Sequence, residues 1–186
     1  MTAARVFLAR HGETDDNAPP ARVMGWIDTP LNERGREQAR ALAREAKQHD
    51  FQALYTSQLA RARETATIVG EAIGLEAVVD ERLAESRRGT WEGRLIDDIR
   101  REEPEAWVAS HENAPGFVFP GGEALAEHCA RVIAALRDVE AGPLPALVVC
   151  HGGSIRCAFA KLDPRGLHAF HELEVPNATL MQLGER

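Results

Sequence analysis

The chain has 186 residues, 44% of them hydrophobic, which is enough to bury a core and predicts a single domain over residues 1–186. Its 22 basic and 29 acidic residues give a formal net charge of −7, which argues against a surface for nucleic acid or for a membrane. No apolar run approaches the roughly 20 residues that span a bilayer, and we expect no signal peptide at the charged N-terminus. Three cysteines are few and odd in number, which suits a reducing compartment, so we expect a cytoplasmic protein.

The first predicted element is a short buried strand over residues 6–9, which ends abruptly at Arg10-His11-Gly12. In a parallel α/β sheet, residues just past the carboxyl end of a strand face the crevice where ligands bind. Arg10 has a permanent planar charge that suits phosphate, and His11 can be neutral and nucleophilic at neutral pH. We expect Gly12 to let the backbone approach a ligand closely. An ordinary strand that ends in a charged turn would have the same sequence pattern. The rest of the chain therefore has to distinguish a ligand-binding turn from an ordinary one.

Helical and strand patterns then alternate along the chain. After a loop over residues 15–30, apolar residues at helical spacing predict a helix over 33–48. A strand is predicted over 53–55, and Ser57 is a suitable N-cap for a helix that Gly74 closes. A third strand is predicted over 77–79.

The second half of the chain begins irregularly, with one or two short helices expected between residues 82 and 119. A helix over 123–139 leads to the most apolar strand, 147–150, and His151 opens a helix that runs to residue 162. Residues 177–183 are predicted to form a last strand. Strands that alternate with helices in this way indicate an α/β fold with a doubly wound sheet.

Two of these strands end in His-Gly, the first at His11 and the fourth at His151. If both strands are parallel and adjacent, the two imidazoles meet at one end of the sheet. Gly152 begins a helix whose free backbone N–H groups suit an anion. Arg61 lies in the first turn of another helix, where a positive charge opposes the helix dipole unless an anion sits there. These features together describe a pocket for a phosphoryl group.

An ordered set of motifs resembles the signature of the histidine phosphatase superfamily, the phosphoglycerate mutase-like proteins. The set runs from residue 5 to about 180 and comprises Arg10-His11-Gly12-Glu13-Thr14 with Asn17, Gly25-Trp26-Ile27-Asp28-Thr29-Pro30-Leu31, Ser57-Gln58-Leu59-Ala60-Arg61-Ala62, Glu85 with Trp91-Glu92-Gly93, Pro120-Gly121-Gly122-Glu123, His151-Gly152-Gly153 and Asn177-Ala178. The resemblance implies a three-layer α/β/α fold whose mostly parallel sheet has its first and fourth strands side by side and one antiparallel strand. The family's sixth strand is not expected, because the chain ends soon after the fifth.

Carried over residue by residue, the resemblance implies a metal-independent phosphatase that uses no cofactor. His11 would be the nucleophile that forms a phosphohistidine, and Glu85 the general acid that afterwards activates water. Contacts to the phosphoryl group would come from Arg10, Arg61, His151, Asn17 and Gly152. The implied partner is a small phosphomonoester, whose identity the sequence does not indicate; nor does it indicate an oligomeric state.

Other positions concern the outer part of the expected pocket. Trp26 lies in the loop beside the expected pocket. Its side chain could pack against other residues or contact a ligand, and the sequence favours neither role. Arg88 stands where relatives more often have an aromatic residue, and with Arg87 and Arg22 it could recognise a second anionic group on the substrate. The remaining histidines sit among polar residues and are assigned no role; they are His49, His111, His128, His168 and His171.

Other chemistries remain open at this point. Cys150 and Arg156 have the spacing of cysteine-dependent phosphatases, although chance also supplies it in an arginine-rich chain. A metal site at the His-Gly turns is disfavoured because Arg10 would repel a cation. Within the family, mutase-type phosphoryl transfer and a non-catalytic phosphate-binding module are the alternatives. The short stretch between Gly93 and Pro120 indicates an open pocket and therefore favours hydrolysis.

Overall fold

The computed structural model describes residues 5–112 and 114–184. In this part of the chain, five strands form one sheet in the order β3-β2-β4-β1-β5. Their bounds are β1 Val6–Arg10, β2 Ala53–Thr56, β3 Ala77–Val79, β4 Ala146–Cys150 and β5 Leu180–Gln182. The strands from β3 to β1 are parallel and β5 pairs antiparallel with β1, which confirms the predicted mostly parallel sheet with one antiparallel strand. Arg10 lies opposite Cys150 in the β1–β4 pair, so the two His-Gly turns begin side by side.

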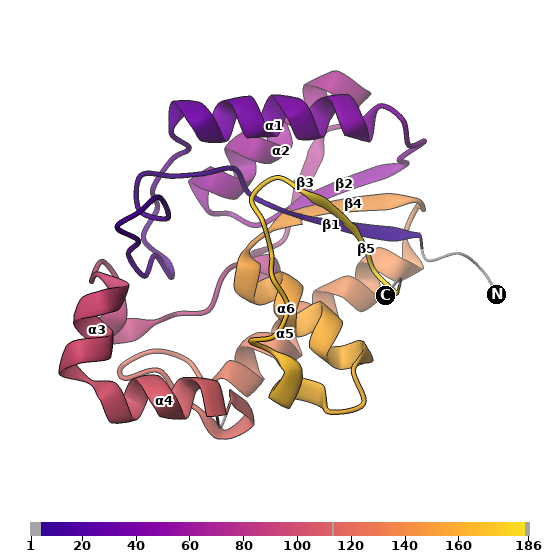
Figure 1. Cartoon of the computed structure of the whole chain (residues 1–186). Helices are drawn as coiled ribbons and strands as arrows, with labels where there is room; N and C mark the ends of the chain where they lie inside the picture. The colour runs from indigo at the N-terminus through magenta and orange to yellow at the C-terminus, as the bar shows by residue number, and fades with distance from the viewer. Residues whose placement is uncertain (1–4, 113, 185–186) are drawn as a thin grey trace.

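Helices cover both faces of the sheet, as a three-layer α/β/α fold requires (Figure 1). Helices α1 (Glu33–Ala46) and α2 (Ala60–Ile73) lie on one face, and α5 (Leu125–Ala141) and α6 (Gly152–Leu162) lie on the other (Figure 1). The irregular region contains two short helices, α3 (Ile96–Glu102) and α4 (Pro104–Glu112), and short 3₁₀ helices occur at Glu81–Leu83, Gly89–Trp91, Ala114–Gly116 and Gly166–Ala169. No helix among the described residues has both the length and the apolar composition to cross a membrane.

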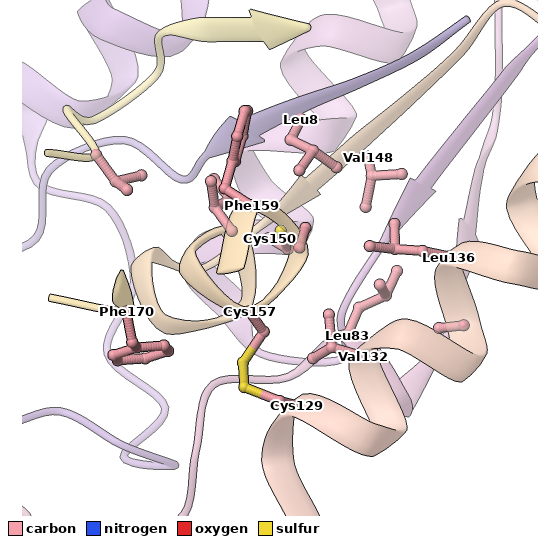
Figure 2. Packing of buried hydrophobic residues seen from close by; sticks show 14 of the residues in the cluster. Leu8, Leu83, Cys129, Val132, Leu136, Val148, Cys150, Cys157, Phe159 and Phe170 are labelled. Atoms are coloured by element: carbon pink, nitrogen blue, oxygen red, sulfur yellow. A yellow bond between two sulfur atoms is a disulfide. The ribbon is translucent and has the colours of Figure 1, made fainter. Parts of the chain in front are cut away.

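The central strands send alternate side chains to the two helical layers, because successive residues of a strand point in opposite directions. Leu8 and Val148 belong to the core under α5 and α6, together with Leu136 and Phe159 (Figure 2). Ala9 belongs to a second cluster on the α1 and α2 side. All residues of β4 are buried, as an unbroken apolar run predicts for a central parallel strand.

Of the two predicted helix ends, Gly74 agrees with the structure and Ser57 does not, and Asn32 forms a cap that was not predicted. The side chain of Asn32 accepts from the backbone N–H of Gly35 and caps α1, and Gly74 ends α2 in the left-handed region at φ 73°. The prediction of Ser57 as the N-cap of α2 is wrong. Leu59 is the N-cap residue, and the Ser57 hydroxyl lies 2.7 Å from Nε2 of His151. A hydroxyl this close to an imidazole has a better partner there than in the first turn of α2.

A disulfide between Cys129 and Cys157 joins α5 to α6 (Figure 2). The cysteine count did not predict this bond, since it suited a set of reduced thiols. The bonded residues are 28 apart in sequence, and closing a loop of that length stabilises a fold by roughly 3.6 kcal/mol in the chain-entropy treatment. Cys150, on β4, is a free and buried thiol.

Candidate active site

His11 lies directly after β1, with a side chain that is 1% exposed. Its Nδ1 is 2.7 Å from the carbonyl oxygen of Gly12. A carbonyl can only accept, so we assign the proton to Nδ1, and Nε2 keeps a lone pair. Burial lowers the pKa of His11 well below 6.5, and the positive charges of Arg10 and Arg61 lower it further. The ring is therefore neutral at neutral pH and presents a nucleophilic nitrogen.

Gly12 has a reason for being glycine other than the predicted approach to a ligand. A Cβ at this position would lie 2.3 Å from the carbonyl oxygen of Gly35, at the start of α1. The backbone N–H of Gly12 donates to Thr65 Oγ1 at 3.0 Å. The turn that orients His11 is thus held between α1 and α2, and any larger residue would push it away from α1.

His151 faces His11 from the end of β4, with 5.2 Å between the ring centroids. The backbone N–H of Leu59 donates to Ser57 Oγ at 3.4 Å, so the Ser57 hydroxyl is free to donate to Nε2 of His151. We therefore assign the proton of this imidazole to Nδ1, which is buried and finds no hydrogen-bond partner among the described residues. Burial, Arg61 and His11 lower the pKa of His151, so its ring is a neutral N–H donor. Sequence reasoning found His151 but missed Ser57, whose role depends on a residue 94 positions away.

The two predicted phosphate-binding arginines are oriented by backbone carbonyls. Arg61 is 0% exposed, and its two terminal nitrogens donate to Ile27 and Gly25 at 2.8 Å each. Arg10 donates from Nη1 to Val175 at 3.0 Å. In both guanidinium groups the Nε–H is buried without an acceptor in the described parts of the chain. Each fixed guanidinium therefore keeps at least its buried Nε–H available for a ligand.

Asn17 completes this set of donors. Its Oδ1 accepts from the backbone N–H of Thr14 at 2.8 Å, and its Nδ2 is buried with no partner in residues 5–112 or 114–184. A buried donor without an acceptor costs about 1–3 kcal/mol, so native proteins seldom keep several of them. Four such donors on predicted site residues are explained by a ligand with several acceptor oxygens. We call His11, His151, Arg10 and Arg61 the inner site.

Glu85 lies next to the inner site, with 14% of its side chain exposed. Its two oxygens accept from the backbone N–H groups of Ser86 at 2.9 Å and Gly153 at 3.0 Å. Burial alone would raise the pKa of Glu85, but the charge of Arg88 and the hydrogen bond from the backbone N–H of Gly153 help to hold this pKa well below its usual value. The carboxylate is therefore ionised in the free protein and is fixed in place at both oxygens.

His128 is buried on α5, beneath Glu85, so the prediction that it sits among polar residues is wrong. Its Nε2 is 4.0 Å from a Glu85 oxygen and 3.2 Å from Ser154 Oγ. Burial lowers the pKa of His128 to about 4, so the ring is neutral. Helical spacing could have found this histidine, because Leu125 and Val132 share its buried face of α5.

A cavity of about 230 Å³ opens beside Glu85, and Arg10, Gly152 and Gly153 line its inner end. Its remaining lining comes from separate segments, and we call five of these residues the outer wall: Arg22, Arg88, Arg156, His111 and His171. Arg22 and Arg88 are thus placed as the sequence analysis expected. His111 and His171, which were given no role, stack on each other in this wall with 4.1 Å between centroids.

Trp26 and Arg87 lie behind the site and do not line this cavity. The indole Nε1 of Trp26 donates to the backbone carbonyl of Glu85 at 2.7 Å. The guanidinium of Arg87 covers the Trp26 ring at 3.9 Å from its centroid. The structure therefore gives Trp26 a packing role as a support for the Glu85 segment.

Cys150 does not have the properties of a catalytic thiol. Its side chain is buried in the core between the sheet and α6 (Figure 2). Burial raises the pKa of Cys150 to about 12, so the thiol is protonated. Arg156, its partner in the sequence motif, donates from Nε to the backbone carbonyl of Leu173 at 3.0 Å. The spacing of these two residues therefore does not mark a thiolate-based site.

Known proteins similar to this chain match it along nearly its whole length. Residues 6–185 match the histidine phosphatase superfamily (branch 1). A protein of Photorhabdus laumondii named probable phosphoglycerate mutase GpmB is 35% identical over 182 residues, which cover 96% of this chain and 84% of that protein. The structure of mycobacterial glucosyl-3-phosphoglycerate phosphatase has a TM-score of 0.84 at 31% identity, covering 96% of this chain and 88% of that one. The α-ribazole phosphatase of Shigella flexneri has a TM-score of 0.80 at 29% identity, covering 95% and 88%.

Proposed function

Because the chain belongs to branch 1 of the histidine phosphatase superfamily, we propose that it hydrolyses small phosphomonoesters through a phosphohistidine on His11, without a metal. Phosphatases among its structural neighbours support this reaction class. The observation that carries the proposal is the neutral, oriented ring of His11 beside the buried N–H donors of Arg10, Arg61 and His151.

In the first step, Nε2 of His11 attacks phosphorus, so that a P–N bond forms while the P–O bond to the leaving alcohol breaks. The Nε–H groups of Arg10 and Arg61 and the Nδ1–H of His151 are suited to bind the phosphoryl oxygens, where negative charge develops. Glu85, which takes up a proton from solvent when the substrate binds, gives that proton to the leaving oxygen. A phosphate dianion next to Glu85 raises the pKa of this carboxyl, because two like charges disfavour ionisation, and so prepares it to act as an acid.

In the second step, a water molecule attacks the phosphohistidine. The Glu85 carboxylate takes a proton from the water, the new P–O bond forms, and the P–N bond breaks to restore neutral His11. Inorganic phosphate leaves, and its negative charge departs with it. The arginines offset charge in both steps, which is why we propose that no metal is needed.

Hydrolysis competes with mutase-type transfer to a second hydroxyl on the same site. Arg22 and His111 line the cavity and are exposed, so water has access to the region beside Glu85. This access favours water as the acceptor. The similarity to a protein named as a phosphoglycerate mutase keeps the mutase alternative in view.

The test is phosphate release from a panel of phosphomonoesters in the presence of a chelator, by the wild type, His11→Ala and Cys150→Ser. We expect activity with chelator present, a loss on the order of 10³-fold or more in His11→Ala, and near wild-type activity in Cys150→Ser. An acid-labile phosphoryl adduct should be trapped on the wild type and on Cys150→Ser but not on His11→Ala.

The same assay with 3-phosphoglycerate separates the two reactions, because a mutase would isomerise it without releasing phosphate. Isomerisation faster than release would replace the phosphatase proposal by the mutase. Loss of activity with chelator, or in Cys150→Ser, would overturn the mechanism.

A further inference from the structure

The cavity beside Glu85 has more positive charge than one phosphoryl group can balance. Four arginines line it, and Glu85 is the one carboxylate among the described lining residues. Four positive charges less one negative charge give these five side chains a net charge of +3. A phosphoryl dianion reduces this to +1. The remaining charge lies on the outer wall, away from the inner site.

Arg156 shows most clearly that this charge is available to a ligand. It lies on α6, one turn after Gly152, and the bond from its Nε to the Leu173 carbonyl orients the guanidinium. Within the described residues its terminal nitrogens have no acceptor, and no carboxylate lies within 4.0 Å. Arginines elsewhere do have such partners: Arg82 is 2.7 Å from Asp80, Arg131 is 2.6 Å from Glu123 and Arg165 is 2.7 Å from Glu172.

The arginines of the cavity lie close enough to repel one another. Burial lowers the pKa of Arg156, Glu85 raises it and Arg88 lowers it again. Arg156 in turn contributes to the lowered pKa of Arg10, after burial and against the opposing effect of Glu85. Holding like charges around so small a cavity costs free energy, which a second bound anion would offset.

Arg88 places this anion on the leaving-group side of the substrate. Its Nη2 is 3.6 Å from the Glu85 carboxylate, which is the group proposed to protonate the leaving oxygen. A substituent on the leaving alcohol therefore extends past Glu85 towards Arg88 and Arg156. His111 and His171 line the same cavity as these arginines.

We infer that Arg156, with Arg88 and Arg22, forms a second anion subsite, so that the preferred substrates are small phosphomonoesters whose leaving group has a carboxylate or a second phosphate. The inference rests on the proposed phosphatase function and adds a substrate class to it. Guanidinium groups bind both kinds of anion through charge-assisted hydrogen bonds. The cavity volume of about 230 Å³ accommodates a leaving group of a few carbon atoms.

The test compares glycerol 3-phosphate, 3-phosphoglycerate and glycerol 1,3-bisphosphate, which share a three-carbon skeleton and differ in the second group. We expect kcat/KM of the wild type to be about ten- to a hundredfold higher for at least one acidic substrate than for glycerol 3-phosphate. In Arg156→Gln this ratio should fall about tenfold or more, and Arg156→Lys should retain part of it. The exposed Arg44→Gln on α1 is the control, because it removes the same charge far from the cavity.

Each outcome assigns the result to one of the two proposals. Preference for the carboxylate or for the second phosphate identifies the anion that the subsite takes. Hydrolysis of all three compounds at similar kcat/KM, or an acidic preference that Arg156→Gln and Arg44→Gln change equally, would overturn the subsite and leave the phosphatase standing. If none of the compounds, nor p-nitrophenyl phosphate, is hydrolysed, the phosphatase proposal fails and the subsite fails with it.

Discussion

The inner site and the outer wall hold positive charge in opposite ways, and Arg10 connects the inner site to the cavity that the outer wall lines. In the inner site, Arg61 is 0% exposed and is fixed by two backbone carbonyls, and burial keeps His11 neutral. In the outer wall, Arg22 is exposed and Arg88 has 20% of its side chain in contact with solvent. Buried donors with one orientation suit a group that every substrate shares, namely the phosphoryl group. Partly exposed arginines from separate segments suit a group that differs between substrates.

The two regions also differ in how they are attached to the fold. His11 and His151 follow directly on β1 and β4, whose pairing fixes the distance between them. The outer wall draws on the loop after β1, on Arg88, on α4 and on α6. Changes in the inner site should therefore affect all phosphomonoesters alike, while changes in the outer wall should affect some more than others.

Glu85 stands between the two regions, and its replacement is the most severe test of the comparison. Glu85→Gln keeps the size of the side chain and its acceptor for Gly153 but removes the proton donor. We expect kcat to fall by about 10²–10⁴-fold for alkyl phosphates. The loss should be much smaller for p-nitrophenyl phosphate, because its leaving group needs little protonation. The exposed Glu81→Gln is the control, and an equal loss on both substrate types would show that Glu85 acts through its charge alone.

The pH dependence of stability tests whether burial keeps the imidazole of His128, beneath Glu85, neutral. Its pKa is about 4 in the folded protein and about 6.5 when unfolded, so below pH 6.5 the unfolded chain takes up a proton that the folded chain does not. Stability is therefore lost as the pH falls. We expect His128 to account for about 2 kcal/mol of the decrease in unfolding free energy between pH 7 and pH 5.

The measurement is denaturant unfolding of wild type and His128→Val at both pH values. The variant should lose about 2 kcal/mol less than the wild type over this interval. Val132→Ala is the matched control, because it removes buried volume from the same helix without a titratable group. A variant that loses as much as the wild type would mean that His128 is charged or solvated in the fold.

Replacement of Ser57 has the smallest expected effect on activity. It also distinguishes the inner site from the outer wall most clearly. Ser57→Ala removes the donor to Nε2 of His151, so the imidazole proton is no longer confined to Nδ1. We expect kcat/KM to fall about tenfold, which corresponds to one hydrogen bond. The decrease should be equal for glycerol 3-phosphate and 3-phosphoglycerate, in contrast to Arg156→Gln. A decrease confined to the acidic substrate would assign Ser57 to the outer wall and contradict the comparison.

Much of the fold and of the inner site could be predicted because its signals are local. The apolar runs before His11 and His151, and Gly74 at a helix end, each lie within a few residues of the feature they predict. Parallel pairing of two such strands was enough to place both histidines at one edge of the sheet. The same local reasoning failed at Ser57, where a nearby imidazole competes with the helix start. It also missed the packing at Gly12, where α1 approaches the turn.

The sequence by itself therefore determined the α/β class and the order of the elements, and it singled out His11 as the proposed nucleophile. Only the tertiary structure decided that His128 lies beneath Glu85, that Cys129 bonds to Cys157, and that Arg156 faces the cavity. The reason is that strands and turns depend on neighbours along the chain. These contacts instead depend on how α5 and α6 pack against the sheet. Glu85 and Gly153, for example, form a hydrogen bond although they are 68 residues apart in sequence, and no local pattern connects them.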